Sequence, residues 1–165
     1  MFEARTIASS DKAEFYRELA LQLEALLEGE HDAIANAANT AALLFHAMAD
    51  LNWAGFYFLR EGDELVVGPF QGKPACVRIA LGRGVCGTAA AHGQSVMVAD
   101  VHAFPDHIAC DAASRSELVV PLIAAGEVFG VLDLDSPLPA RFDADDQAGV
   151  ERLAEIYIAS SDRRT

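Results

Sequence analysis

The chain has 165 residues, of which 52% are hydrophobic and 22% charged, a composition typical of a folded globular protein. Its 25 acidic and 12 basic side chains give a formal net charge of −13, and a field of that sign disfavours binding to nucleic acid or to an anionic membrane. No apolar run reaches the ~20 residues of a membrane span, and residues 1–15 lack the pattern of a secretion signal. We therefore expect a cytoplasmic protein.

The first part of the chain is predicted to be helical. Residues 11–28 place apolar side chains at helical spacing after polar residues that can cap a helix. An alanine-rich run at 31–49 continues the helical pattern, so we expect the N-terminal helices to occupy roughly residues 11–49.

Short strands and their loops are predicted from roughly residue 52 to 136. Alternating or aromatic segments at 53–59, 65–70, 76–81 and 95–99 indicate strands, and residues 117–135 indicate two more around a turn at Ala125-Gly126. A short helix is expected at 87–92, stopped by Gly93, and the C-terminal helix at roughly 143–160.

Short connections between successive strands favour an antiparallel sheet. The predicted fold is therefore α+β, in two layers: about six antiparallel strands, with the N- and C-terminal helices packed on one side. No repeat or linker divides the sequence, so we expect residues 1–165 to form a single domain.

The three cysteines are the first candidates for chemistry: Cys76, Cys86 and Cys110. Buried, inert thiols are the ordinary alternative. Cys110, however, lies in a polar loop at 99–116, longer than the usual connection of roughly 4–6 residues. His107 could stabilise a Cys110 thiolate, whereas Asp106 and Asp111 would raise the pKa of the thiol, so the direction stays open.

Cys86 lies in the glycine-rich stretch "GRGVCG", which matches the spacing of a dinucleotide-binding loop. Such a site needs a parallel sheet and a longer helix after the glycines, so we exclude it. A helix N-terminus beside Cys86 would lower the pKa of its thiol. A tight turn with Cys86 as a packing residue explains the stretch equally well.

A metal site is a further alternative. His92, His102, His107 and Cys110 could act as ligands, but they lack the close paired spacings of common zinc motifs. We therefore expect no metal, although a zinc hydrolase remains a third interpretation of the sequence.

The segment "GVLDLDS" ends a predicted strand with two carboxylates. Alternate strand residues share a face, so one face should carry Phe129, Val131, Asp133 and Asp135. That face could supply the apolar wall and anionic end of a pocket, or it could simply reach solvent.

Glu117 begins the partner strand of the same hairpin. A strict two-residue turn would place it opposite Leu134, on the other face, whereas a three-residue turn or a bulge would place it with the aspartates. Both registers stay open at this point.

Five stretches together resemble the free methionine-R-sulfoxide reductases, a family built on the GAF domain: "NWAGFYFL", "GPFQGKPACVRIALGRGVCGTA", "DVHAFPDHIACDAASRSELVVPL", "GVLDLDS" and "RFDADD". The resemblance implies a GAF-like fold and a thiol-dependent enzyme that reduces free L-methionine-R-sulfoxide to L-methionine. It implies no bound cofactor, thioredoxin with NADPH as the external reducing system, and a role in oxidative stress. The alternative is a GAF module that senses a small molecule or redox state without turnover.

The resemblance also implies roles for individual residues. Cys110 would be the nucleophile, forming a sulfenic acid that Cys76 resolves as an intramolecular disulfide. Cys86 could be a second resolving thiol, and a reversed assignment of the cysteine roles stays open. Substrate would be bound by Trp53, Glu117, Asp133 and Asp135. A homodimer is a further expectation, because the N-terminal helices are predicted to be exposed.

Overall fold

The computed structural model of the chain describes residues 2–60, 63–105 and 111–162. Within them lie six strands: β1 (Trp53–Arg60), β2 (Glu64–Gly72), β3 (Arg78–Ala80), β4 (Val96–Val98), β5 (Ser116–Ala124) and β6 (Glu127–Ser136). They form one antiparallel sheet in the order β3-β2-β1-β6-β5-β4. The predicted sheet type is thus confirmed.

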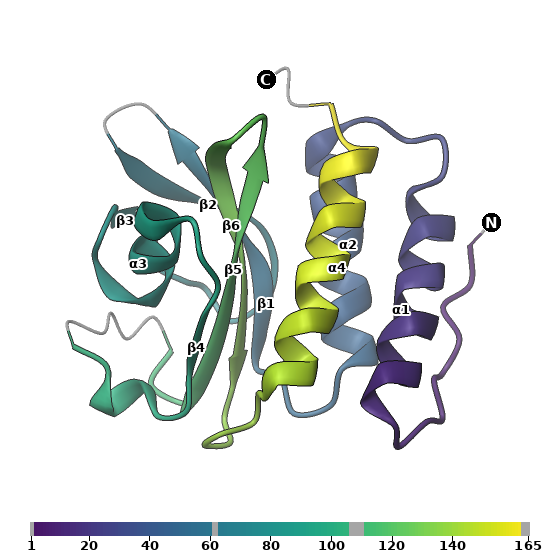
Figure 1. Ribbon diagram of the computed structural model, residues 1–165, viewed down its shortest axis with the longest axis horizontal. Coiled ribbons are helices and arrows are strands. Elements are labelled where there is room, and N and C mark those ends of the chain that lie inside the picture. Colours follow the sequence, from purple (N-terminus) through teal and green to yellow (C-terminus); the bar gives the residue numbers. More distant parts are fainter. Residues whose placement is uncertain (1, 61–62, 106–110, 163–165) are drawn as a thin grey trace.

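The N- and C-terminal helices lie on one side of this sheet, as predicted: α2 (Ala33–Ala47) and α4 (Ala144–Ser160) pack against its face, and α1 (Lys12–Leu27) packs on these two helices from outside (Figure 1). Each begins after an aspartate whose side chain accepts hydrogen bonds from backbone N–H groups of the first turn: Asp11, Asp32 and Asp143. The core between helices and sheet is formed by fully buried side chains that include Leu19, Leu23, Leu44, Phe56, Leu132, Leu153 and Tyr157.

The opposite face of the sheet carries α3 (Gly84–His92), the short 3-10 helix η1 (Val101–Ala103) and the connecting loops (Figure 1). The α3 helix begins three residues before the predicted start and ends at Gly93, which adopts a left-handed φ of 62°. Its nine residues and the antiparallel sheet confirm that "GRGVCG" is not a dinucleotide loop. A second apolar cluster lies here, including Tyr57, Ile79, Val85 and Val131.

The third strand is shorter than predicted. It covers only Arg78–Ala80, so Cys76 lies in the connection between β2 and β3 rather than in a strand.

None of the helices in the described residues is long and apolar enough to cross a membrane.

The hairpin of β5 and β6 shows which of the two predicted registers places Glu117 relative to Asp133 and Asp135. The turn has two residues, Ala125 and Gly126, both with positive φ, and a β-bulge follows where the register shifts between Leu122 and Ile123. Beyond this bulge Glu117 pairs with Asp135. The bulge alternative is therefore the one that the fold adopts.

The same bulge corrects one predicted position. Phe129 was expected to share a face with Val131, but it packs against the core beneath the helices, whereas Val131 belongs to the cluster on the opposite face. An extra residue in one strand of a ladder reverses the alternation on one side of it. Val128 takes the place beside Val131 instead.

Candidate active site

A pocket opens on the face of the sheet that carries α3. Five of the predicted site residues line it together: Trp53, Cys86, Glu117, Asp133 and Asp135. They come from β1, α3, β5 and β6. Apolar and carboxylate side chains therefore meet in one concavity, as the sequence predicts.

The apolar wall of the pocket is a stack of aromatic rings. Trp53 lies between Phe70, at 5.2 Å between ring centroids, and Tyr57, at 5.7 Å. The indole N–H of Trp53 donates a hydrogen bond to the carbonyl oxygen of Lys73 at 3.2 Å. Ring stacking and this hydrogen bond fix the orientation of the indole. Tyr57 was not among the predicted site residues, although its place four residues after Trp53 on the same strand face could have identified it.

Three carboxylates form the anionic end. Glu117 and Asp133 are 6% and 5% exposed, and Asp135 sits opposite Glu117 in the sheet. Burial raises the pKa of Glu117 and of Asp133 well above the usual range, and the neighbouring carboxylates raise both further. Burial also raises the pKa of Asp135, to about 7. Near neutral pH this cluster therefore holds protons that isolated carboxylates would have lost.

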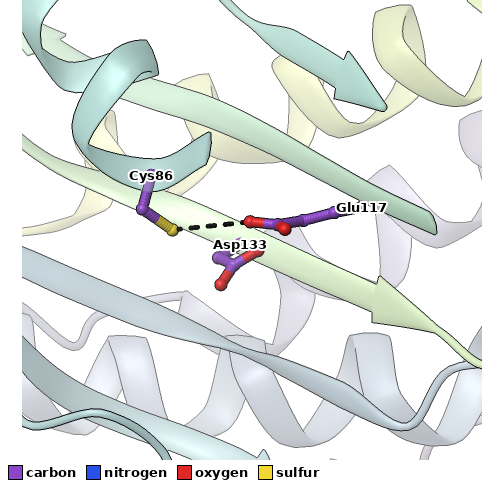
Figure 2. A group of neighbouring side chains, drawn as sticks. All are labelled: Cys86, Glu117 and Asp133. Carbon is purple, nitrogen blue, oxygen red and sulfur yellow. Dashed lines mark hydrogen bonds between the residues drawn. The ribbon is translucent and has the colours of Figure 1, made fainter. Parts of the chain in front are cut away.

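Cys86 is a buried free thiol in the first turn of α3. Its Sγ donates a weak hydrogen bond to Glu117 Oε1 at 3.9 Å, and Asp133 lies beside this pair (Figure 2). Burial raises the pKa of the Cys86 thiol well above its usual value, and the charges of Asp133 and Glu117 raise it further. Of the two alternatives for Cys86, its burial and its neighbouring carboxylates favour the packing residue over the thiolate.

Cys76 lies at the rim of the pocket. It is partly buried and disulfide-bonded, and its backbone carbonyl accepts a hydrogen bond from the Tyr57 hydroxyl at 3.1 Å. Pro74 and Ala75, which precede it, line the pocket. The other thiol of the sequence hypothesis, Cys110, lies outside the described residues with Asp106 and His107.

A polar network closes the other side of the pocket. Asn52 donates hydrogen bonds to Asp111 Oδ2 at 3.2 Å and to Ser114 Oγ at 3.0 Å. Lys73 Nζ lies 3.4 Å from Asp111 Oδ1, and the Ala113 N–H is the main cause of the lowered pKa of Asp111. Asp111 and Ser114 line the pocket, but the sequence offered no signal for Ser114.

One group of side chains could hold a metal ion within the described residues. Its ligand atoms belong to Cys86, Glu117 and Asp133 and lie within 4.8 Å of one another. Neither His92 nor His102, the two described histidines of the zinc hypothesis, belongs to this group.

Comparisons with known proteins agree with this geometry. Residues 35–157 match the family model of the GAF domain. The chain is 52% identical over 155 residues to the free methionine-R-sulfoxide reductase of Escherichia coli strain K12, covering 92% of this chain and 93% of that protein. It is 61% identical to a solved structure from Burkholderia vietnamiensis described as a GAF sensor protein, with a TM-score of 0.88 and coverage of 92% and 96%.

A third relative has been solved with its substrate bound. It is the free methionine-R-sulfoxide reductase of Neisseria meningitidis, 50% identical, with a TM-score of 0.93 and coverage of 97% of this chain and 95% of that one. The family model matches most of the chain, and these relatives are similar to it over nearly their full length. Together they identify its family. The chain belongs to the GAF-domain family of free methionine-R-sulfoxide reductases.

Proposed function

We propose that the protein reduces free L-methionine-R-sulfoxide to L-methionine. The observation that carries the proposal is the meeting of three carboxylates with an aromatic wall in a single pocket. A free amino acid presents an ammonium group, which carboxylates attract, and a methyl sulfoxide, whose methyl group can pack on Trp53 and Tyr57. A methionine sulfoxide residue within a protein has no ammonium group of its own, so the carboxylates favour the free amino acid.

The carboxylates also suit the chemical step. Glu117 and Asp133 have raised pKa values because they are buried, so one of them can be protonated near neutral pH. A protonated carboxyl group can donate its proton to the sulfoxide oxygen while the remaining carboxylates hold the ammonium group. Asp135 suits the second role, because its pKa of about 7 allows it to be ionised near neutral pH.

The proposed reaction uses two thiols. The thiolate of Cys110 attacks the sulfoxide sulfur, the oxygen passes to the enzyme as a cysteine sulfenic acid, and methionine leaves. The Cys76 thiol then attacks the sulfenic acid sulfur, releasing water and forming an intramolecular disulfide. A dithiol reductant returns both cysteines to thiols and is itself oxidised to a disulfide.

The surroundings of Cys76 and Cys86 support Cys76 as the resolving thiol. Cys76 is disulfide-bonded at the pocket rim, whereas Cys86 is reduced, buried and beside two carboxylates that disfavour its thiolate. A thiolate is the attacking species in disulfide formation. These contrasts support Cys76 as the resolving cysteine and Cys86 as a residue of the pocket floor.

The remaining parts of the proposal concern the surroundings of the enzyme. The reductant is a cytoplasmic protein dithiol, expected to be thioredoxin supplied with electrons by NADPH, and no cofactor stays bound. A homodimer is part of the proposal but does not enter the reaction.

An epimer-resolved chromatographic assay tests the proposed function. The reduced protein should consume free L-methionine-R-sulfoxide in the presence of a dithiol and leave the S epimer unchanged. Cys110→Ser should abolish even a single turnover without reductant, whereas Cys76→Ser should release one methionine per chain and then stop. Cys110→Ser protein that still releases stoichiometric methionine would overturn the assignment of the nucleophile.

Counting free thiols separates an enzyme from a sensor. Turnover without reductant should remove two free thiols per chain, because Cys76 and Cys110 become a disulfide. Binding of the R epimer with no loss of thiols and no methionine released would instead favour a sensor.

A further inference from the structure

We propose that Cys86, Glu117 and Asp133 form a binding site for one Zn²⁺ ion and that this ion excludes the substrate from the pocket. The second half of the proposal rests on the proposed function, because it takes the same pocket to be the substrate site. The first half concerns ion binding alone and stands on the geometry of the three side chains.

The three side chains converge from different parts of the fold. Cys86 projects from the first turn of α3, Glu117 from β5 and Asp133 from β6 (Figure 2). Their potential ligand atoms lie within 4.8 Å of one another, and the Cys86 Sγ and Glu117 Oε1 atoms are 3.9 Å apart. All three are at least nine-tenths buried, so the backbone already holds them near one point.

A second observation points to an absent ligand. Among the residues that the structure describes, the Oδ1 atom of Asp133 is buried and finds no hydrogen-bond partner, although Asp133 lines the pocket. A buried polar atom of this kind costs about 1–3 kcal/mol when it stays unsatisfied. A cation in the pocket beside Asp133 would satisfy it directly.

The distances suit a small tetrahedral ion. Zinc bonds of about 2.3 Å to sulfur and about 2.0 Å to a carboxylate oxygen separate these two ligands by roughly 3.5 Å. The observed separation of 3.9 Å for Cys86 and Glu117 therefore needs a shift of only a few tenths of an ångström. The pocket leaves a fourth position for water, as in zinc sites with three protein ligands.

The ligand types select among cations. A thiolate with two carboxylates gives one soft and two hard donors, a set that suits borderline Zn²⁺. Mg²⁺ and Ca²⁺ prefer six or more oxygen ligands, and the cluster offers only two carboxylate side chains beside the sulfur. With both carboxylates and the thiol ionised, the three ligands carry more negative charge than Zn²⁺ neutralises.

The Zn²⁺ ion and the substrate would compete for the same side chains of the pocket. Glu117 and Asp133 would be bonded to the ion, so neither could protonate the sulfoxide oxygen or help Asp135 to hold the substrate ammonium. Zn²⁺ would thus inhibit the enzyme reversibly, without oxidising any thiol.

Calorimetric titration of Zn²⁺ into the full-length Cys76→Ser/Cys110→Ser variant tests the site. In that variant Cys86 is the sole thiol of the chain, and a phosphine can keep it reduced without competing as a thiol ligand would. We expect one ion per chain. Adding Cys86→Ser or Asp133→Asn should weaken binding at least about tenfold, whereas Asp145→Asn, an exposed aspartate of α4, should not change it.

Two further measurements keep the test decisive. Co²⁺ in place of Zn²⁺ should give a thiolate charge-transfer absorption that the added Cys86→Ser removes, and thermal unfolding should identify any variant that fails to fold. If Cys86→Ser does not fold, Asp133→Asn and Glu117→Gln each carry the same expectation. Zn²⁺ binding that is unaffected by these substitutions, or no binding at all, would overturn the site.

Free methionine-R-sulfoxide added to the same titration separates this proposal from the proposed function. It should weaken the apparent Zn²⁺ affinity in proportion to its concentration. Binding of Zn²⁺ without any reduction of the sulfoxide would contradict the reductase function, whereas the proposal of a metal site would stand. If the protein reduces the sulfoxide but its apparent Zn²⁺ affinity does not change when substrate is added, the proposed competition would be overturned.

Discussion

Replacing Asp135 with asparagine is predicted to stabilise the substrate-free protein above neutral pH. Burial raises the pKa of Asp135 from 3.8 to about 7, so the folded state binds this proton more tightly than the unfolded state. The contribution of Asp135 to stability is therefore complete below about pH 4 and is lost as the pH rises to about 7. An asparagine side chain carries no charge at any pH and avoids this loss.

The magnitude follows from the two pKa values. The difference between 3.8 and about 7 corresponds to an upper limit of about 4 kcal/mol. Asp135 keeps some contact with water, and we therefore expect about half, near 2 kcal/mol, at about pH 8. For a protein of this size that gain equals a rise in Tm of roughly 4–8 °C.

Urea unfolding followed by circular dichroism, repeated between about pH 4 and pH 8, measures the effect. The two proteins should be equally stable at about pH 4, and their stabilities should diverge as the pH rises.

Asp143→Ala provides a control whose effect on stability should have the opposite pH dependence, because hydrogen bonding and charge from Lys12 lower the pKa of Asp143 to about 2. Loss of this helix cap should cost about 1 kcal/mol at neutral pH and less as the pH falls. Equal destabilisation by Asp135→Asn at every pH would refute the reasoning.

Further substitutions test separate parts of the structure. Replacing the acid, by Glu117→Gln or by Asp133→Asn, should lower kcat by about 10²–10⁴ in the epimer-resolved assay, because an amide cannot donate the proton, and a rise in KM alone in both variants would contradict a carboxyl acid. Trp53→Ala should lower kcat/KM at least about tenfold while Trp53→Phe retains more activity, because the wall is apolar, and equal rates for both would contradict it. Gly149→Ala should lower stability by about 1–3 kcal/mol in urea unfolding, because its added Cβ would lie 2.2 Å from the Tyr16 ring; an unchanged midpoint would contradict that packing.

The general fold could be predicted from the sequence because its signals are local. Helical spacing, capping aspartates and short strand connections lie within a few residues of one another, and each survives in the structure. The strand predicted at 76–81 was too long because alternation alone does not reveal where pairing stops. The choice of which strand neighbours which was not open to prediction from local pattern.

The candidate site was predicted as a set of residues but not as an arrangement. The carboxylates of β6 follow from alternation, whereas Glu117 joins them only through a bulge that moves the register by one residue. The raised pKa of Cys86 was missed because the sequence indicates that Cys86 lies near the start of a helix but does not indicate that it is buried. Ser114 was missed because its hydrogen bond to Asn52 links two segments that lie 62 residues apart in the sequence.

The bulge beside the turn connects these observations. Without it, the partner of Asp135 in the sheet would be a neighbour of Glu117 rather than Glu117 itself, and Glu117 would face the helical core. A charge there would lie among the apolar side chains beneath α1, α2 and α4. With the bulge, Glu117 instead reaches the pocket that Asp133 and Asp135 line, where protonation or a bound positive group can offset the cost of burying its charge. The register of one hairpin thus determines whether Glu117 shares the face of Asp133 and Asp135, on which the proposed substrate site depends.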